Sequence, residues 1–126
     1  RTIFSAYNSS PFFEYYKDDI QPFFESKFDF LFDFNFKIHE TVCELLEIQN
    51  NTFLTTDFEK VPDDTLNLRE TISPKISSEV DLEFKPQKYT QVFSDKLGFV
   101  EGLSILDLLF NEGPNSYTVL EASVAR

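Results

Sequence analysis

Five phenylalanines occupy every second position from Phe28 to Phe36, in the stretch KFDFLFDFNFK. Alternation with a period of two residues is typical of a strand with one buried face, so this stretch taken alone predicts a β-strand. The chain continues without a turn residue into IHETVCELLEI, where the apolar residues hold helical spacing and Glu, Leu and Lys favour helix. We expect one long central helix from about Asp29 to Glu47, and only this continuation decides between helix and strand for residues 28–36.

The core of this chain must be built largely from aromatic rings. Its 126 residues include 16 phenylalanines and five tyrosines, with no tryptophan and no methionine. Flat rings pack edge to face or offset, so the core should interlock specifically. A chain of this length makes one domain with a sizeable buried interior. We therefore predict a single, mainly α, compact domain over residues 1–126.

Helix signals dominate the first part of the chain. Residues 3–7 carry a short apolar helical face that ends at the turn-forming tripeptide NSS. Ser10 then precedes a proline, the arrangement of an N-cap followed by proline at the first helical position, and predicts a helix through Tyr16. Asp18 with a glutamine three residues later predicts a third helix that runs to about Lys27.

The middle of the chain is the least regular part. Residues 51–58 are rich in β-branched and aromatic types between turn residues and predict a short strand, and residues 88–93 predict another strand or an extended approach to the turn at Gly98. Residues 59–87 contain three prolines and many charges. We interpret them as a long irregular surface connection within the domain.

The last helix signal is the clearest. Ser104 is an expected N-cap, the run ILDLLF is apolar almost all round, and Gly113 followed by proline ends the helix. A helix of this composition is buried. The single charge in the run, Asp107, lies at the third helical position, and we interpret it as bonding the free N–H groups of the first turn in preference to catalysis. A short final helix should follow.

Charge and cysteine content exclude several classes of function. The net charge of −11 argues against binding to nucleic acid or to an anionic membrane surface. The sequence contains neither a run of about 18 apolar residues nor a signal segment, so we expect no membrane insertion. Cys43 is the single cysteine and suits a reducing compartment, which favours the cytoplasm.

His39 and Cys43 are four residues apart on the predicted long helix and could interact there. A structural zinc site needs about four protein ligands, and the chain has no second histidine or cysteine to complete it. We favour a buried structural cysteine beside a rim histidine and expect no metal site. The sequence likewise shows no phosphate-binding loop or serine elbow, so we expect no cofactor and assign no catalytic residue.

The sequence resembles the WbqC-like protein family from about Thr2 to Leu120, and LSILDLLFNEGP is the most specific part. The stretches that carry the resemblance are RTIFSAYNSSPFFEYYKDDI, FLFDFN, NLRETISPK and QVFSDKLGFVEGLSILDLLFNEGP. The chain departs from the pattern at Glu101 and Gly102, where a proline followed by asparagine is expected. The family-like positions are Tyr7, Ser10, Pro11, Phe13, Tyr16, Arg69, Pro74, Gln91, Phe93, Gly98, Phe99, Ser104, Asp107 and Asn111.

The resemblance implies a bacterial, cytoplasmic protein of surface-polysaccharide (lipopolysaccharide O-antigen) biosynthesis, with transfer of a small acyl or aminoacyl group to a sugar. It also implies that this chain is the C-terminal part of a longer one, as does its opening on Arg1 inside a helical run. The expected partners are that missing N-terminal portion and a sugar or nucleotide-sugar ligand.

Two hypotheses follow from the sequence. In the first, Tyr7, Ser10, Tyr16 and Arg69 line one wall of an enzyme's ligand pocket, where Arg69 holds a phosphate or carboxylate with its planar guanidinium. In the second, the chain is a non-catalytic helical binding or scaffolding module with a large exposed apolar patch. Convergence of the tyrosine hydroxyls on a cavity distinguishes the first from the second.

Overall fold

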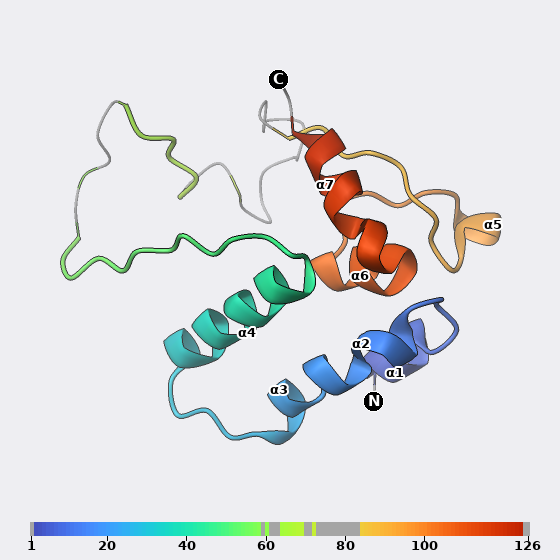
Figure 1. Ribbon diagram of the computed structural model, residues 1–126, viewed down its shortest axis with the longest axis horizontal. Helices are drawn as coiled ribbons and strands as arrows, with labels where there is room; N and C mark the ends of the chain where they lie inside the picture. The colour runs from blue at the N-terminus through green and yellow to red at the C-terminus, as the bar shows by residue number, and fades with distance from the viewer. Residues whose placement is uncertain (1, 59, 61–63, 70–71, 73–83, 125–126) are drawn as a thin grey trace.

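Figure 1 shows the computed structural model as a series of helices joined by extended segments. The structure describes residues 2–58, 60, 64–69, 72 and 84–124. Helices dominate these residues, which confirms the mainly α fold class. In chain order the elements are α1 (Thr2–Tyr7), α2 (Phe13–Ile20), α3 (Pro22–Glu25), α4 (Leu31–Leu45), α5 (Ser94–Leu97), α6 (Ile105–Glu112), the 3₁₀ turn η2 (Gly113–Asn115) and α7 (Ser116–Ser123).

The core forms where α2 contacts α6, to the right of the centre in Figure 1. Phe110 on α6 is fully buried, and its ring centroid lies 5.2 Å from that of Phe13 and 5.0 Å from that of Tyr7. The backbone N–H of Phe12 donates to the carbonyl of Phe110 at 2.9 Å. Two helices far apart in sequence are therefore joined by both ring packing and a main-chain bond. The buried cluster consists of Phe13, Tyr16, Ile20, Leu46, Leu109 and Phe110.

The long helix is confirmed, and α4 ends within two residues of each predicted boundary. Two of the alternating phenylalanines, Phe28 and Phe34, pack with Phe23 of α3, whereas Phe30 and Phe32 are exposed. The expected central position is wrong, because Cys43 is the single buried residue among those of α4. Only residues at its C-terminal end, Val42, Leu45 and the following Leu46, pack in or against the core cluster.

The two predicted strands do not form in the part of the chain that the structure describes. Residues 51–58 are exposed and have no strand assignment, and residues 88–91 have none either, while residues 92–93 form a turn directly before α5. The one β contact in the described residues is an isolated antiparallel bridge between Phe84 and Val124. Strand propensity is expressed only when a neighbouring strand supplies hydrogen-bond partners, and neither segment has one here.

The N-terminal helix boundaries differ from those predicted. Ser10 does not cap α2; its hydroxyl donates at 2.5 Å to the carbonyl of Tyr7, at the end of α1. Phe12 occupies the N-cap position without a side-chain cap bond. Asp18 lies inside α2 and does not start a third helix, because Gln21 keeps helical angles and its N–H bonds to the carbonyl of Lys17. The third helix is therefore a single turn.

The predicted start and end of the apolar helix near the C-terminus are confirmed. Ser104 caps α6 by accepting a hydrogen bond from the N–H of Leu106 at 3.2 Å. Gly113 follows the helix with φ of +57°, and a Cβ there would lie 2.5 Å from the ring of Phe12. Glycine is therefore required both for the turn and for the close approach of Phe12. The predicted final helix is α7.

The irregular connection predicted for residues 59–87 lies mostly outside the described residues, which include only 60, 64–69, 72 and 84–87 of it. In these short pieces the structure shows turns, bends and one bridge residue. No helix in the described part of the chain is long and apolar enough to cross a membrane.

Candidate functional site

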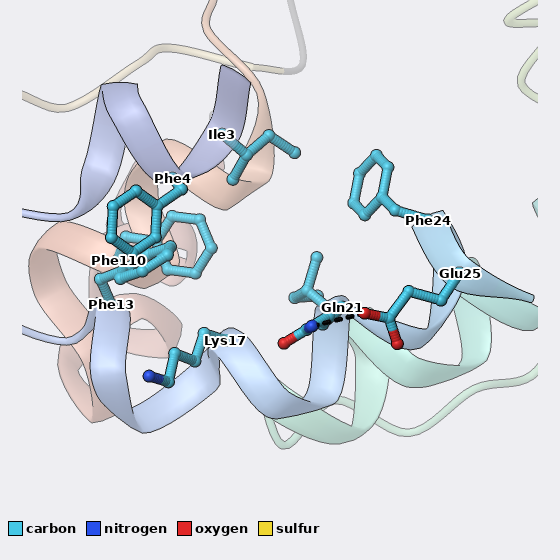
Figure 2. Close-up of a pocket in the computed structure, with 9 residues that line it drawn as sticks. Ile3, Phe4, Phe13, Lys17, Gln21, Phe24, Glu25 and Phe110 are labelled. Atoms are coloured by element: carbon cyan, nitrogen blue, oxygen red, sulfur yellow. Dashed lines mark hydrogen bonds between the residues drawn. The ribbon is translucent and has the colours of Figure 1, made fainter. Parts of the chain in front are cut away.

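A cavity of about 520 Å³ lies between α1, α2, α3 and α6. Figure 2 shows Phe4, Phe13 and Phe110 gathered at one side of it and Phe24 at the other. The rings of Phe4 and Phe13 meet at 78° with centroids 5.7 Å apart, so this wall is a packed aromatic surface. The volume is in the range of pockets that bind small molecules. The apolar lining residues are Ile3, Phe4, Phe13, Ile20, Phe24 and Phe110.

Three polar side chains follow one edge of this cavity on successive helical turns: Lys17, Gln21 and Glu25 (Figure 2). The amide of Gln21 donates to the carboxylate of Glu25 at 2.6 Å. The ammonium of Lys17 pairs with Glu14 at 2.8 Å, and that hydrogen bond raises the pKa of Lys17. The edge, which we call the polar rim, therefore presents a cation, an amide and an anion in order beside an aromatic wall.

A second polar arrangement lies inside the protein, around Asp107 on α6. This side chain is only 5% exposed. Its Oδ2 accepts a hydrogen bond from the hydroxyl of Tyr89 at 2.6 Å and another from the amide of Gln91 at 3.0 Å. Asn111, one turn later, donates to the carbonyl of Asp107 at 2.7 Å. The predicted bonding of this carboxylate to the N–H groups of the first helical turn is therefore wrong. Its donors are side chains from a segment distant in the sequence.

The amide of Gln91 also closes the loop that contains α5. Its Nε2 donates to the carbonyl of Val100 at 2.8 Å, and its Oε1 accepts from the N–H of Val100 at 2.9 Å. One side chain thus supplies the pair of bonds that a strand partner would make. Because the same amide bonds Asp107, the loop is fastened to α6. The Oδ1 of Asn111 is buried and accepts no hydrogen bond from the described residues.

The network shifts the pKa values of two tyrosines. Burial, the Asp107 charge and a hydrogen bond with Asp107 raise the pKa of Tyr7 to about 12. Burial and the hydrogen bond to Asp107 also raise the pKa of Tyr89 well above its usual range. Both hydroxyls therefore stay protonated and act as donors to the carboxylate at neutral pH.

These shifts predict a loss of stability in alkaline solution. Tyrosines of the unfolded chain ionise near pH 10, whereas Tyr7 ionises near pH 12 in the fold. Between these values the unfolded state has released more protons, so the free energy of unfolding should fall as pH rises. Urea unfolding measured across this range checks the prediction. The Tyr7→Phe variant should lose less stability over the same interval; an equal loss would contradict the assignment to Tyr7.

The structure brings together only some of the residues predicted for a ligand site. Tyr7 and Ser10 are joined at the end of α1, and Tyr7 reaches Asp107. Tyr16 is buried in the core on α2 and borders a different, smaller cavity. Arg69 lies on the segment 64–69, with its guanidinium 5.0 Å from the ring centroid of Phe58. In Figure 1 that segment lies beyond α4, away from α1 and α2.

The sequence interpretation missed the polar network itself. Gln91, Asp107 and Asn111 appear among the family-like positions, but nothing in their spacing showed that they meet. Tyr89 was not singled out at all. The available signal was the lone charge in the apolar run ILDLLF, since a buried carboxylate requires donors from elsewhere in the fold. The sequence alone does not say which residues donate.

The pair of His39 and Cys43 behaves as expected for a structural cysteine beside a rim histidine. Cys43 is buried, His39 is exposed, and their Sγ and Nε2 atoms are 3.7 Å apart. The same Nε2 lies 3.3 Å from the hydroxyl of Thr52. No group of three or more potential metal ligands of the His, Cys, Asp or Glu type occurs among residues with described positions.

These features define a small helical domain with an aromatic cavity under a polar rim and a separate buried carboxylate network. A family model, described as the WbqC-like protein family, matches residues 1–79 and 73–119. The two matches cover most of the chain, so the protein belongs to the WbqC-like protein family. A comparison with curated proteins and one with solved structures each gave no significant match.

Proposed function

We propose that this protein acts in the bacterial cytoplasm in surface-polysaccharide (O-antigen) biosynthesis, where it binds an acyl or aminoacyl group for transfer to a sugar. Membership of the WbqC-like family supports the process. The polar rim beside the aromatic wall of the 520 Å³ cavity supports the ligand class and is the observation that carries the proposal. The sugar or nucleotide sugar, and an N-terminal portion of a longer chain, are the proposed partners.

The rim fits a ligand with an amine at one end and an anionic group at the other. Glu25, held by Gln21, offers a carboxylate to an ammonium group, and Lys17 offers an ammonium to an anion. Eight residues of helix separate these two charges by roughly 12 Å along the axis. In the structure the ammonium of Lys17 is paired with Glu14, on the side away from Glu25, so it must leave that ion pair and turn along the rim to shorten this span. A ligand with separated charges therefore fits better than a single free amino acid.

The aromatic wall accounts for the middle of such a ligand. Phe4 and Phe24 expose ring surface at the cavity, and Phe13 and Phe110 form its floor from the core. Burial of an apolar side chain against these rings supplies most of the binding free energy, while the rim charges fix its orientation. Tyr7 and Ser10 contribute indirectly, because they hold the end of α1, which carries Phe4.

The dipeptide leucyl-leucine is a suitable probe, since it carries an ammonium and a carboxylate on either side of apolar chains. We expect it to raise the melting temperature. Its amidated form lacks the carboxylate, and its acetylated form lacks the ammonium; each should bind roughly threefold to tenfold more weakly. The Lys17→Met variant lacks the cation for the carboxylate, so it should bind leucyl-leucine and its amidated form equally. The Glu25→Gln variant lacks the anion for the ammonium, so it should bind leucyl-leucine and its acetylated form equally.

The control variants are Lys85→Met and Glu121→Gln, which remove exposed charges outside the cavity lining. They should leave all three affinities unchanged. Glu14→Gln should strengthen binding of the parent dipeptide, because it frees the ammonium of Lys17 from its ion pair. If the unsubstituted protein binds all three dipeptides equally, the charges of the polar rim do not recognise the ends of the ligand.

A second candidate function is a non-catalytic binding or scaffolding module. It is favoured by large apolar side chains that are exposed on α3 and at the start of α4, namely Phe24, Phe30, Leu31 and Phe32. Exposed apolar surface of this kind is typical of interaction sites. If none of the dipeptides binds, this second candidate becomes the better account of the cavity and of these residues.

A further inference from the structure

A second cavity, of about 150 Å³, lies between α2, the C-terminal end of α4 and the start of α7. Three of its lining residues are tyrosines and two are glutamates, and none of them is a lysine, arginine or histidine. It shares no lining residue with the larger cavity under the polar rim. The residues around it are Tyr15, Tyr16, Glu44, Leu45, Leu46, Glu47, Gly113, Pro114 and Tyr117.

The tyrosines form an open corner of aromatic rings, which we call the tyrosine corner. The rings of Tyr15 and Tyr16 stand at 90° to each other with centroids 4.7 Å apart. Tyr16 is buried in the core and fixes the inner position, whereas Tyr15 and Tyr117 are exposed. A ligand can therefore reach the rings of Tyr15 and Tyr117 from solvent without any rearrangement of the core.

The two glutamates come from the end of α4. Glu44 lies in its last turn, and Glu47 follows it with a φ of +59°, a region that residues other than glycine rarely adopt. Burial, then the charges of Tyr15, Glu47 and Asp19, raise the pKa of Tyr16, so the Glu47 carboxylate acts on the inner tyrosine. A glycine at position 47 would remove the backbone strain, but the glutamate present there keeps a carboxylate beside the rings.

We propose that the tyrosine corner binds an organic ammonium group, either a quaternary ammonium or a protonated primary amine. Aromatic faces attract such cations through their ring quadrupoles, and the neighbouring carboxylates add charge attraction. The small volume suits a single ammonium head group and not a whole nucleotide or sugar. This site is independent of the proposed function, because it uses other residues on another side of α2.

Three probes of similar size separate charge from shape: choline, its uncharged isostere in which carbon replaces the nitrogen, and butylammonium. Tyrosine fluorescence titration or chemical shifts of the ring protons report binding directly. We expect choline or butylammonium to bind and the uncharged isostere to bind roughly threefold to thirtyfold more weakly. Preference for choline indicates a methylated ammonium ligand, and preference for butylammonium indicates a primary amine such as a lysine side chain.

Tyr117→Ala removes an exposed wall of the corner and should weaken cation binding about tenfold, whereas Tyr117→Phe keeps the ring and should retain most of it. Glu44→Gln should weaken binding severalfold, and Glu121→Gln, on the exposed part of α7, is its matched control. Equal affinity for choline and its uncharged isostere, no binding of either cation, or no effect of Tyr117→Ala would each overturn the proposal.

Discussion

Replacing Phe110 with alanine should lower the free energy of unfolding by about 3–5 kcal/mol, the usual cost of removing a buried phenylalanine ring. Phe110 is 0% exposed, and its ring contacts those of Phe13 and Tyr7. Its removal leaves a void between α1, α2 and α6 that these neighbours can fill only in part. Urea unfolding followed by circular dichroism measures the change.

Two variants make the Phe110 prediction specific. Phe110→Leu keeps most of the buried volume and should cost clearly less than the alanine variant. Phe53→Ala removes the same ring from a side chain that is 90% exposed, and should change stability by less than about 0.5 kcal/mol. If Phe110→Ala and Phe53→Ala cost the same, the α2–α6 contact is not the centre of the core.

Local sequence signals predicted the helices well where capping and composition agreed. α6 has an N-cap at Ser104, an apolar run and a glycine stop, and the structure forms it as predicted. α4 was predicted against its alternating phenylalanines, because helical spacing persisted after them. At α6 several independent local signals favoured the same structure, whereas at α4 the helical spacing outweighed a conflicting strand-like alternation.

The strand predictions failed for a physical reason that a single sequence does not contain. Residues 51–58 and 88–93 have strand composition, but a strand needs a partner at a distance along the chain. For residues 88–93, the side chain of Gln91 takes the place of that partner by bonding Val100 twice. Side-chain amides of this kind leave no periodic pattern, so composition alone overstates the strand content.

The candidate site was predicted only in part for a similar reason. Tyr7 was predicted to line a ligand pocket, and the structure places its hydroxyl against Asp107 in the buried network. The polar rim was not foreseen, because the second helix was expected to end at Tyr16 and the third to begin at Asp18, which left Lys17 between them and apart from Gln21 and Glu25. Once α2 continues to Ile20, the three side chains fall on successive turns of one edge.

The short helix α6 contributes residues both to the larger cavity and to the buried network around Asp107. Phe110 forms the floor of the cavity, and Asp107, three residues earlier, anchors the loop that contains α5. Because a helix brings residues three apart close together, disturbance of one function of α6 should reach the other. The change in the free energy of unfolding caused by a substitution at Asp107 therefore tests whether the buried network stabilises the fold.

Replacing Asp107 with alanine should lower the free energy of unfolding by about 3–5 kcal/mol, since each buried donor left without an acceptor costs about 1–3 kcal/mol. Tyr89 and Gln91 both lose the carboxylate to which they donate, and Gln91 is itself buried. Chemical unfolding gives the total cost, and proteolysis at the α5 loop should become faster because its anchor to α6 is lost.

Further variants separate the stability that comes from the hydrogen bonds of Asp107 from the effect of removing a negative charge. Asp18→Ala removes an exposed carboxylate from α2 and should change stability by less than about 0.5 kcal/mol. Tyr89→Phe should cost about 1.5–3 kcal/mol, because it removes one hydrogen bond to a charged group. Tyr89 and Asp107 act through the same bond, so the double variant should cost less than the sum of the single variants. Strict additivity would mean that the hydroxyl of Tyr89 and the carboxylate of Asp107 do not interact in solution, and that burial alone determines the cost at each position.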